Sequence, residues 1–365
     1  MPPFPPPSAD PIDAGVSLFV RFPELAGRLP WRPLGVYPTP VQPIADRPGL
    51  WIKREDLSSP AYGGNKVRTI EGHIGYVLAR GVEEIWSTGA YGSNHALCTA
   101  IHAGRVGLRA GAVLFPQPPT STAQTNLRAM IGVGASLRAL MTPVTLPLHM
   151  LQLARRAYVM TPGGAVPRGA FGHVSAAFEL AAQVADGSCP SPQTIVLPVG
   201  STCTSAGLLV GLQIAARNGW WPAPAPRVMS VAIGPWPFTS KAAILWLAKR
   251  TLRSLEGLLG RSLNVQDADL AAGLQVERRF IGRGYGHPTA WGAAAKSTMT
   301  TWGGPPLDAV YSAKAGAAAL ELSGETLFWS TKSSAPLPRA GDEGQAPWLM
   351  RRWLARPPAL PPPSR

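Results

Sequence analysis

The chain has 365 residues, of which 45% are apolar and 15% charged, and its formal net charge is +14 at pH 7. This length suffices for one large domain or two lobes, and the composition excludes a wholly disordered protein, a coiled coil and a small disulfide-rich scaffold. The basic residues are scattered singly or in pairs and form no stripe interleaved with aromatic residues. We therefore expect no nucleic-acid partner.

The cysteines and the N-terminal sequence bear on compartment and metal binding. Cys98, Cys189 and Cys203 form no CxxC or Cys/His metal spacing and cannot make a paired disulfide framework, so we expect no metal site. The N-terminus lacks the basic and apolar regions of a secretory signal. The long uncharged stretch 187–216 is interrupted by prolines and a Gly-Ser-Thr run, which fits a buried strand, a loop and a helix better than a membrane span. A cytoplasmic protein is expected.

Strands and helices alternate between two proline-rich ends. The first expected strands lie at 50–52, 84–88 and 110–115, with helices over 65–80, 94–105 and 122–130. Strands at 194–199, 227–233 and 325–330 follow, with helices over 205–217 and 241–259, from 289 and after 313. Short apolar strands separated by long helices indicate an α/β fold of twisted parallel sheets with crossover helices. Residues 1–14, expected to be disordered, and 336–365 are expected to be tails that bury little surface, unless Trp348, Leu349 and Trp353 dock.

The first candidate segment is Gly63-Gly64-Asn65-Lys66, at the start of a helix. The glycines permit a sharp turn and leave space around the next side chain. A lysine at a helix start lies at the positive end of the dipole, which disfavours its charged form and lowers its pKa. An uncharged amine is what imine formation with an aldehyde requires. Taken alone, the segment also fits a loop with a solvated lysine.

The second segment runs from Gly89 to His95, between a strand and a helix. Ser93 and Asn94 fit either a helix cap or a site that holds a substrate carboxylate at the helix start. The Ser-Asn-His string also suggests a hydrolase. That alternative is weak, because a GxSxG motif is absent and adjacent residues rarely form a Ser–His pair.

The third segment begins at Gly200, Ser201, Thr202, Cys203 and Thr204, between a buried strand and a helix. Successive backbone amides, small hydroxyls and the helix dipole form a phosphate cradle. The segment lacks the GK[ST] ending of a nucleotide P-loop and the GxGxxG of a dinucleotide site. A phosphate monoester is therefore the expected ligand, although Ser and Thr would also cap this helix.

The fourth segment covers 307–314 and is preceded in the sequence by Tyr285. Tyr311, with the hydroxyl of Ser312 beside it, could stack on or lie at the edge of a planar ring, or it could simply pack in the core. One cofactor accounts for all four segments: pyridoxal 5'-phosphate requires a lysine for the Schiff base, a phosphate cradle and groups around a flat ring.

At this point the sequence resembles the 1-aminocyclopropane-1-carboxylate deaminase / D-cysteine desulfhydrase family. The resemblance spans about 37–331 and rests on KREDLSSPAYGGNKVRTIE, GAYGSNHALCTA, PVGSTCTSAGLLVGL, GYGHPT and LDAVYSAKAGAAAL in that order. It implies a fold type II pyridoxal-phosphate enzyme, tryptophan synthase beta-like, that forms a cytoplasmic homodimer with its cofactor between two lobes. The large lobe would contain 15–52 and 190–335, and the small lobe 53–189.

The resemblance also implies roles for individual residues. Lys66 would be the Schiff-base lysine, Asn94 the partner of the ring hydroxyl, and Ser93 the contact of the substrate carboxylate. The phosphate would lie on the loop from Gly200 to Thr204, and Ser312 or Thr331 would face the ring nitrogen. Tyr285 and Tyr311 would flank the reacting carbon. Thr202 and Cys203 stand where relatives often have glycine, and Leu97 replaces an arginine or similar residue; these departures put the substrate in doubt more than the cofactor.

We expect a lyase or deaminase that acts on a small amino acid, by β-elimination that gives a 2-oxo acid and ammonia. Ring opening of aminocyclopropane carboxylate and β-replacement are the alternatives within enzymes, and a degenerate cofactor-binding or scaffold protein is the alternative outside them. Ser312 occupies the position where the deaminase branch commonly has a glutamate facing the ring nitrogen. A carboxylate there would favour the protonated ring, so we expect D-cysteine or a related amino acid as substrate rather than aminocyclopropane carboxylate.

Overall fold

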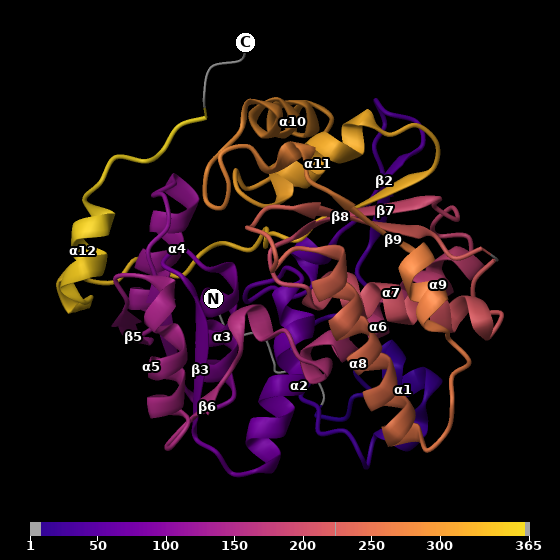
Figure 1. The fold of residues 1–365 in the computed structure, drawn as a ribbon, viewed down its shortest axis with the longest axis horizontal. Coiled ribbons are helices and arrows are strands. Elements are labelled where there is room, and N and C mark those ends of the chain that lie inside the picture. Colours follow the sequence, from indigo (N-terminus) through magenta and orange to yellow (C-terminus); the bar gives the residue numbers. More distant parts are fainter. Residues whose placement is uncertain (1–8, 223, 362–365) are drawn as a thin grey trace.

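A computed structural model describes residues 9–222 and 224–361 and contains two sheets (Figure 1). The six-stranded sheet has the order β1 (Val41–Pro43), β2 (Leu50–Lys53), β10 (Thr326–Trp329), β7 (Thr194–Val199), β8 (Arg227–Ala232), β9 (Leu274–Glu277), and all its neighbours are parallel except β1 and β2. The four-stranded sheet is parallel, with the order β5 (Ser136–Ala139), β4 (Arg109–Phe115), β3 (Glu84–Ala90), β6 (Tyr158–Val159). The expected α/β fold with parallel sheets and crossover helices is confirmed.

The described part of the chain contains twelve α-helices, which cover both faces of each sheet. Their bounds are α1 Ser17–Arg21, α2 Lys66–Ala79, α3 Asn94–Arg105, α4 Ser121–Gly132, α5 Leu146–Leu153, α6 Pro167–Ala185, α7 Cys203–Arg217, α8 Lys241–Leu259, α9 Asp267–Ala272, α10 Ala290–Thr301, α11 Ser312–Glu321 and α12 Trp348–Leu354. Every helix expected from the sequence is present within a few residues of its expected bounds. The elements β5, α5, β6 and α6, which lie between residues 136 and 185, were not among the predictions.

Side-chain alternation along β7 explains how the six-stranded sheet is covered. Ile195 and Leu197 pack with α6 and α7, whereas Val196, between them, packs with α10 and α11 on the opposite face. Because successive side chains of a strand point to opposite faces, a continuous apolar strand needs helices on both sides. Figure 1 shows α10 and α11 on one side of this sheet and α6, α7 and α8 on the other.

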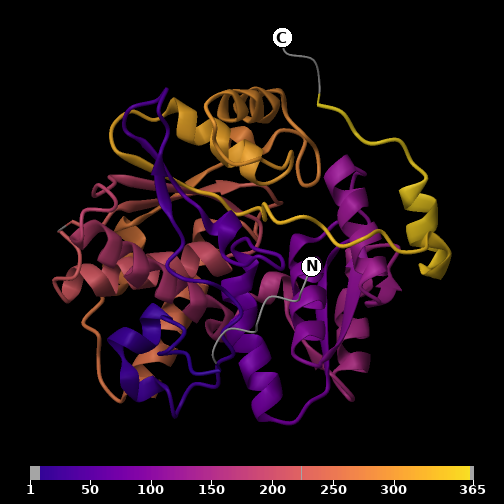
Figure 2. The same ribbon diagram turned by 180° about the vertical axis from the view of Figure 1, so that it is seen from behind.

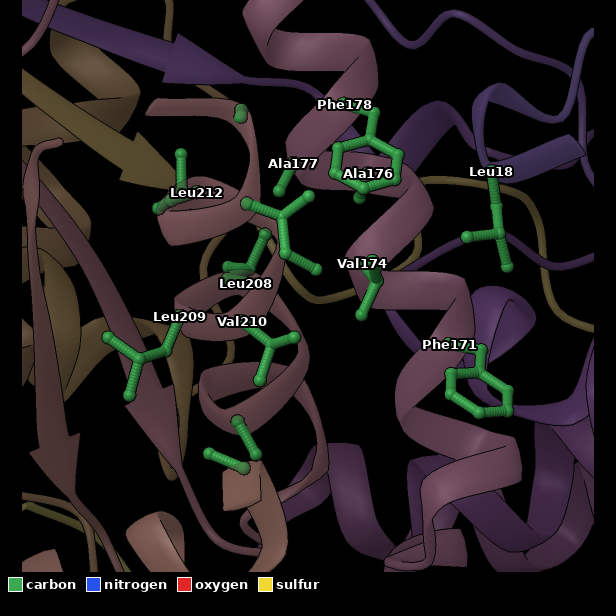
Figure 3. Close-up of a cluster of buried hydrophobic side chains, with 14 of the residues drawn as sticks. Leu18, Phe171, Val174, Ala176, Ala177, Phe178, Leu208, Leu209, Val210 and Leu212 are labelled. Atoms are coloured by element: carbon green, nitrogen blue, oxygen red, sulfur yellow. The ribbon is translucent and has the colours of Figure 1, made fainter. Parts of the chain in front are cut away.

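The α6–α7 pair forms the centre of the largest buried cluster. Figure 3 shows Val174 and Phe178 of α6 beside Leu208 and Val210 of α7, and all four side chains are at most 1% exposed. Helix α6 therefore packs with the helices of the six-stranded sheet, although the sequence prediction assigned 53–189 to the other lobe. We propose a lobe boundary before α6 instead of at residue 189.

Part of the segment after residue 335 is folded and packs against the rest of the protein. It crosses to the four-stranded sheet and ends in α12, which lies against that lobe (Figure 2). Trp353 is 2% exposed, its indole N–H donates to the Gln117 carbonyl over 2.6 Å, and its ring meets Tyr91 edge to face. Gln124 donates to the carbonyls of Leu354 and Arg356. The expectation that this segment buries little surface is thus wrong for α12, where Trp353 docks.

Replacing Trp353 by alanine is expected to destabilise the protein by about 3–5 kcal/mol, because a large buried side chain leaves a cavity. Thermal or urea unfolding of the two proteins measures this difference. Trp348→Ala is the matched control, since Trp348 lies on the same helix with 59% of its surface exposed. Equal stability of the Trp353 variant and the parent protein would contradict the observed docking. Residues 1–8 and 362–365 lie outside the described residues.

Candidate active site

The segments singled out in the sequence come together where β3, β7 and β10 end. Ser93 follows β3, the loop 200–204 follows β7, and Thr331 follows β10. Lys66 begins α2 and lies against the loop 200–204. In α/β proteins, ligands bind at the carboxyl ends of parallel strands, so the two sheets place these residues at the expected type of site.

Lys66 is half-buried, and its contacts differ from those of the fully buried Lys53 and Lys314. Its Nζ donates to Ser201 Oγ over 3.2 Å, and burial lowers its pKa. Lys53 instead donates to the carboxylate of Glu179, and Lys314 donates to two backbone carbonyls. Lys66 therefore combines a pKa lowered by burial with an amine that no carboxylate among the described residues pairs with, as attack on an aldehyde requires.

The turn before Lys66 is tied to two other parts of the site. Gly64 has a φ of +93°, and a Cβ there would lie 2.6 Å from the Thr331 carbonyl oxygen, so this position requires glycine. The Asn65 backbone N–H donates to that same carbonyl, and Asn65 Nδ2 donates to Thr204 Oγ1 over 2.8 Å. The turn thus connects the lysine to β10 on one side and to the loop 200–204 on the other.

The loop 200–204 leads directly into the N-terminus of α7. Thr202 is the residue before the helix, and its side chain makes no capping hydrogen bond. The first-turn N–H groups of a helix have no partners within the helix, and the dipole adds partial positive charge there. A Cβ at Gly200 would lie 3.0 Å from the Tyr311 ring, so glycine permits the close approach of that tyrosine. The backbone N–H groups of this turn and the hydroxyls of Ser201 and Thr202 are donors of the kind that an anion requires.

Cys203 and Thr204 face the interior on the other side of this turn. Cys203 is fully buried, its Sγ lies 3.6 Å from the Gly164 carbonyl oxygen, and burial raises its thiol pKa to about 11. Thr204 Oγ1 lies between Asn65 Nδ2 and His173 Nε2. These two residues contribute backbone N–H groups to the loop, while their side chains fix it to its surroundings.

Asn94 is held by residues that the sequence analysis did not single out. Its Oδ1 accepts from Tyr62 OH over 3.1 Å and from Asn126 Nδ2 over 2.8 Å, and Lys332 Nζ donates to Tyr62 OH over 2.9 Å. With Oδ1 occupied, the Asn94 Nδ2 is left to donate to a ligand. Tyr62 directly precedes the two glycines of the lysine turn, and Asn126 is a polar residue on the buried face of α4; both were available signals.

Ser93 caps α3 and still retains a donor. Its Oγ accepts from the Ala96 backbone N–H over 3.2 Å, which confirms the capping alternative from the sequence. The hydroxyl hydrogen is not used in that bond. Ser93 can therefore stabilise the helix and donate to a carboxylate at the same time.

Tyr285 and Tyr311 form a hydrogen-bonded pair. Their hydroxyl oxygens are 2.6 Å apart, and their rings meet edge to face. Burial raises the pKa of Tyr285 to about 12 and raises that of Tyr311 as well. Both hydroxyls are therefore protonated near neutral pH. One of the two hydroxyl protons lies between the oxygens, so the other remains available for donation to a ligand.

Ser312 and Thr331, the two candidates for the ring nitrogen, differ in their surroundings. The Ser312 hydroxyl donates to Asp308 Oδ2 over 2.7 Å, and Asp308 also accepts from the backbone N–H of Tyr311. Ser312 is fully buried and is the first residue of α11. Thr331 is 9% exposed, and its hydroxyl has no hydrogen-bond partner among residues 9–222 and 224–361. The sequence analysis named Ser312 or Thr331 for the ring nitrogen, and the structure shows that the Ser312 hydroxyl already donates to Asp308.

These residues together fit pyridoxal 5'-phosphate. Lys66 offers an amine with a lowered pKa beside the start of α7, which has no side-chain cap, and these features suit the aldehyde and the phosphate of the cofactor. Asn94 Nδ2 and the Thr331 hydroxyl are polar groups that remain available to a planar heteroaromatic ring.

The described residues include no helix that is long and apolar enough to cross a membrane.

Comparison with known proteins agrees with this fit. The model of the pyridoxal-phosphate dependent enzyme family matches residues 33–325, and the chain belongs to that family. A solved structure described as an ACC deaminase homologue has a TM-score of 0.70 and 26% identity, covering 92% of this chain and 99% of that one. The predictions of fold type II, of the family resemblance and of the cofactor are confirmed, and the chain is a pyridoxal-phosphate-dependent enzyme.

Two curated relatives are similar over most of their length. Nocardicin C-9' epimerase of Nocardia uniformis is 31% identical over 84% of this chain and 94% of that protein. D-cysteine desulfhydrase of Salmonella paratyphi A is 28% identical over 76% of this chain and 84% of that protein. The expected class, a pyridoxal-phosphate-dependent lyase or deaminase of small amino acids, agrees with the family and with the desulfhydrase and deaminase relatives.

Proposed function

We propose that this enzyme catalyses β-elimination from a small amino acid with a leaving group on its β carbon, as in D-cysteine, to give a 2-oxo acid and ammonia. The observation that carries the proposal is that the loop 200–204 adjoins both groups: Lys66 donates to Ser201, and Gly200 lies against the ring of Tyr311, which pairs with Tyr285. The similarity to a D-cysteine desulfhydrase supports the choice of reaction.

Lys66 and Ser93 are proposed to act on the α carbon and on the carboxylate of the substrate. When bound, pyridoxal phosphate supplies an electron sink for negative charge at the α carbon. Burial lowers the pKa of Lys66, so its uncharged Nζ can accept the α proton. The free hydrogen of Ser93 and the N-terminus of α3 hold the substrate carboxylate and orient this proton toward the lysine.

The tyrosine pair is proposed as the acid for the leaving group. Tyr285 and Tyr311 are both protonated near neutral pH because burial raises their pKa values. A proton delivered to the departing sulfur or oxygen makes it a better leaving group. The bond from the β carbon breaks with its electrons on the leaving group, and water then converts the released enamine into the 2-oxo acid and ammonia.

The remaining predicted residues are proposed to hold the cofactor. The loop from Gly200 to Thr204 would hold the phosphate through backbone N–H groups, assisted by the hydroxyls of Ser201 and Thr202. Asn94 Nδ2 would donate to the ring oxygen, with Tyr62 and Asn126 as its positioning residues. For the ring nitrogen we propose Thr331, since the Ser312 hydroxyl is engaged by Asp308.

Replacing Ser201 by alanine is expected to weaken cofactor binding by about 1.5–3 kcal/mol, the usual contribution of one hydrogen bond to a charged group. This corresponds to a dissociation constant raised by about one to two orders of magnitude. Equilibrium dialysis followed by absorbance titration measures the change.

Ser205→Ala is the control for this prediction. Ser205 lies in the first turn of α7 and is fully buried, and its Oγ accepts from Ser230 Oγ. The variant therefore makes the same chemical change without removing a donor from the loop. Equal cofactor affinity in the Ser201 variant and in the parent enzyme would argue against the phosphate position proposed here.

Epimerisation at the α carbon is the second candidate function. The similarity to an epimerase extends over 94% of that protein, more than the 84% covered in the desulfhydrase. Inversion of configuration needs one group to remove the α proton and another to return a proton on the opposite face. Lys66 and the Tyr285–Tyr311 pair supply a base and an acid, so the same residues suit either outcome.

One experiment separates the two functions. The purified enzyme is incubated with both enantiomers of a panel of amino acids in deuterated water. Elimination predicts keto acid and ammonia in equal amounts from substrates with a β leaving group, D-cysteine included. Epimerisation predicts deuterium at the α carbon together with the opposite enantiomer and no keto acid. A panel that gives neither product while the cofactor is bound would overturn both functions and favour a degenerate cofactor-binding or scaffold protein.

The assembly and the alternative reactions also belong to this proposal. We propose a cytoplasmic homodimer that acts on a small amino acid, with neither nucleic acid nor membrane as a partner. Ring opening of aminocyclopropane carboxylate and β-replacement are tested in the same panel, by addition of the cyclopropane substrate and of a second thiol. Size-exclusion chromatography with light scattering tests the dimer.

A further inference from the structure

A second cavity, of about 680 Å³, lies beside the proposed active site but is separate from it. Residues 28–30, α2, β6, α6 and α8 form its walls. The segment 161–166 runs between the two sites: Thr161 and Val166 line the cavity, whereas the Cβ position of Gly163 lies 3.8 Å from Lys66 Nζ. A volume of this size is within the range of small-molecule sites.

The charged side chains that line this cavity are all positive. Arg28, Arg80 and Arg168 line it, and none of its lining residues is an aspartate or a glutamate. None of these three arginines forms an ion pair with a residue within 9–222 or 224–361. Helix α6 starts at the cavity with a proline and without a side-chain cap, so its dipole adds positive character. Three unneutralised guanidinium groups in a concave surface attract anions.

Aromatic side chains hold one of these arginines in place. The Arg168 guanidinium lies 3.5 Å from the centre of the Tyr76 ring and donates to Tyr158 OH over 3.0 Å. The Tyr158 hydroxyl in turn lies 2.8 Å from His73 Nδ1, and His73 Nε2 lies 3.1 Å from the Gly164 carbonyl oxygen. Carbonyl oxygens only accept, so His73 carries its proton on Nε2 and accepts from Tyr158. Arg168 is therefore presented in a fixed orientation.

Arg80 and Arg28 complete the cluster from two other elements. Arg80 lies 4.6 Å from the centre of the Tyr76 ring, so that ring has two guanidinium groups against it, and Arg28 donates to the Leu258 carbonyl of α8. Both side chains are exposed, which leaves donors for a ligand. Guanidinium groups bind carboxylate and phosphate oxygens in a bidentate manner. Because Arg80 and Arg168 already lie against the Tyr76 ring, anionic oxygens rather than a stacked ring fit the cavity.

We propose that this cavity is a binding site for a small organic anion with at least two acidic oxygen groups, either phosphates or carboxylates. The site is distinct from the one that would hold the substrate carboxylate near Ser93. It does not depend on the proposed reaction, because it uses none of the residues assigned to cofactor or substrate.

Calorimetric titration of the full-length holoenzyme tests the proposal, with pyrophosphate and citrate as the two probes. The cofactor must be bound so that its phosphate occupies the loop 200–204 and the probes cannot. We expect one saturable site per chain with a dissociation constant below about 1 mM. Tighter binding of pyrophosphate would indicate a phosphorylated ligand, and tighter binding of citrate would indicate a polycarboxylate.

Two double variants show whether the binding belongs to the cavity. Arg28→Gln/Arg80→Gln is expected to weaken binding by about tenfold or more, since charge-assisted hydrogen bonds are lost. Arg351→Gln/Arg352→Gln removes the same charge from α12, outside the cavity, and should bind like the parent. All four side chains are exposed, so both variants should keep their unfolding temperature. Absence of saturable binding in the parent enzyme, or equal weakening in the two variants, would overturn the proposal.

Discussion

Lys66→Ala is expected to abolish the covalent attachment of the cofactor and to lower turnover by about 10²–10⁴-fold or more, as expected when a proton-transfer group is lost. The reason is that Lys66 alone combines a lowered pKa, a position beside the uncapped start of α7 and the absence of a charged partner among the described residues. The visible absorption band of the bound cofactor should shift or disappear, while the unfolding temperature of the apoprotein should change little.

Lys332→Met is the informative control for this prediction. Lys332 is also half-buried, burial lowers its pKa as well, and its Nζ donates to Tyr62 OH. If burial alone defined the reactive lysine, either residue would serve. We expect the Lys332 variant to keep its covalent cofactor, with altered affinity through Tyr62 and Asn94. Loss of attachment in this variant and its retention in Lys66→Ala would refute our assignment.

Arg68→Met is expected to destabilise the protein by about 3–5 kcal/mol, the usual effect of removing one partner from a buried ion pair. Arg68 is 1% exposed and donates to both oxygens of Glu55 and to Glu179. Lys53 also pairs with Glu179. Arg68 lies two positions after Lys66 on α2. Without its guanidinium, Glu55 would remain buried without an ion-pair partner. Urea unfolding of the apoprotein measures the loss.

An exposed pair provides the comparison for Arg68. Arg217 donates to both oxygens of Asp269 on the surface, and Arg217→Met should change stability by no more than about 1 kcal/mol. Equal losses of stability in the Arg68 and Arg217 variants would contradict this expectation.

Glu179 gives the stability of the folded protein a pH dependence. Burial alone would raise its pKa, but the charges of Arg68 and Lys53 lower it to about 2. Because the pKa is lower in the folded state than in the unfolded state, where it is near 4.5, the ionised carboxylate stabilises the folded protein above about pH 4.5. This contribution is lost as the pH falls toward 2.

Local patterns in the sequence were enough to predict the alternation of strands and helices. The same holds for the positions of the four candidate segments, each of which lies next to a helix. The lysine turn has its glycines, and the loop 200–204 has its small hydroxyls between an apolar strand and a helix. The burial of Trp353 could not be predicted from local patterns. Its burial depends on Tyr91 and Gln117, more than 200 residues earlier in the chain, and the prolines around it resemble those of an unstructured tail.

The hydrogen bond from Ser312 to Asp308 was missed in the sequence analysis, although both residues belong to one segment. The hydroxyl beside Tyr311 was visible in the sequence, but its proton is donated to Asp308, four residues earlier. Asp308 also accepts from the backbone N–H groups of Tyr311 and Ser312, and it was present in the same sequence segment. Asn126 was missed for a related reason. Its amide is directed at Asn94 from another helix, and only the packing of α3 against α4 brings them together.

Borohydride reduction of the purified holoenzyme, followed by peptide mass analysis, tests the central claim most directly. The chain has seven lysines, and four of them have pKa values lowered chiefly by burial. The account predicts one stable adduct with the mass of the reduced cofactor, on the peptide that contains Lys66. An adduct on the peptide of Lys332, Lys314 or Lys53, or no adduct on a protein that has bound the cofactor, would contradict it.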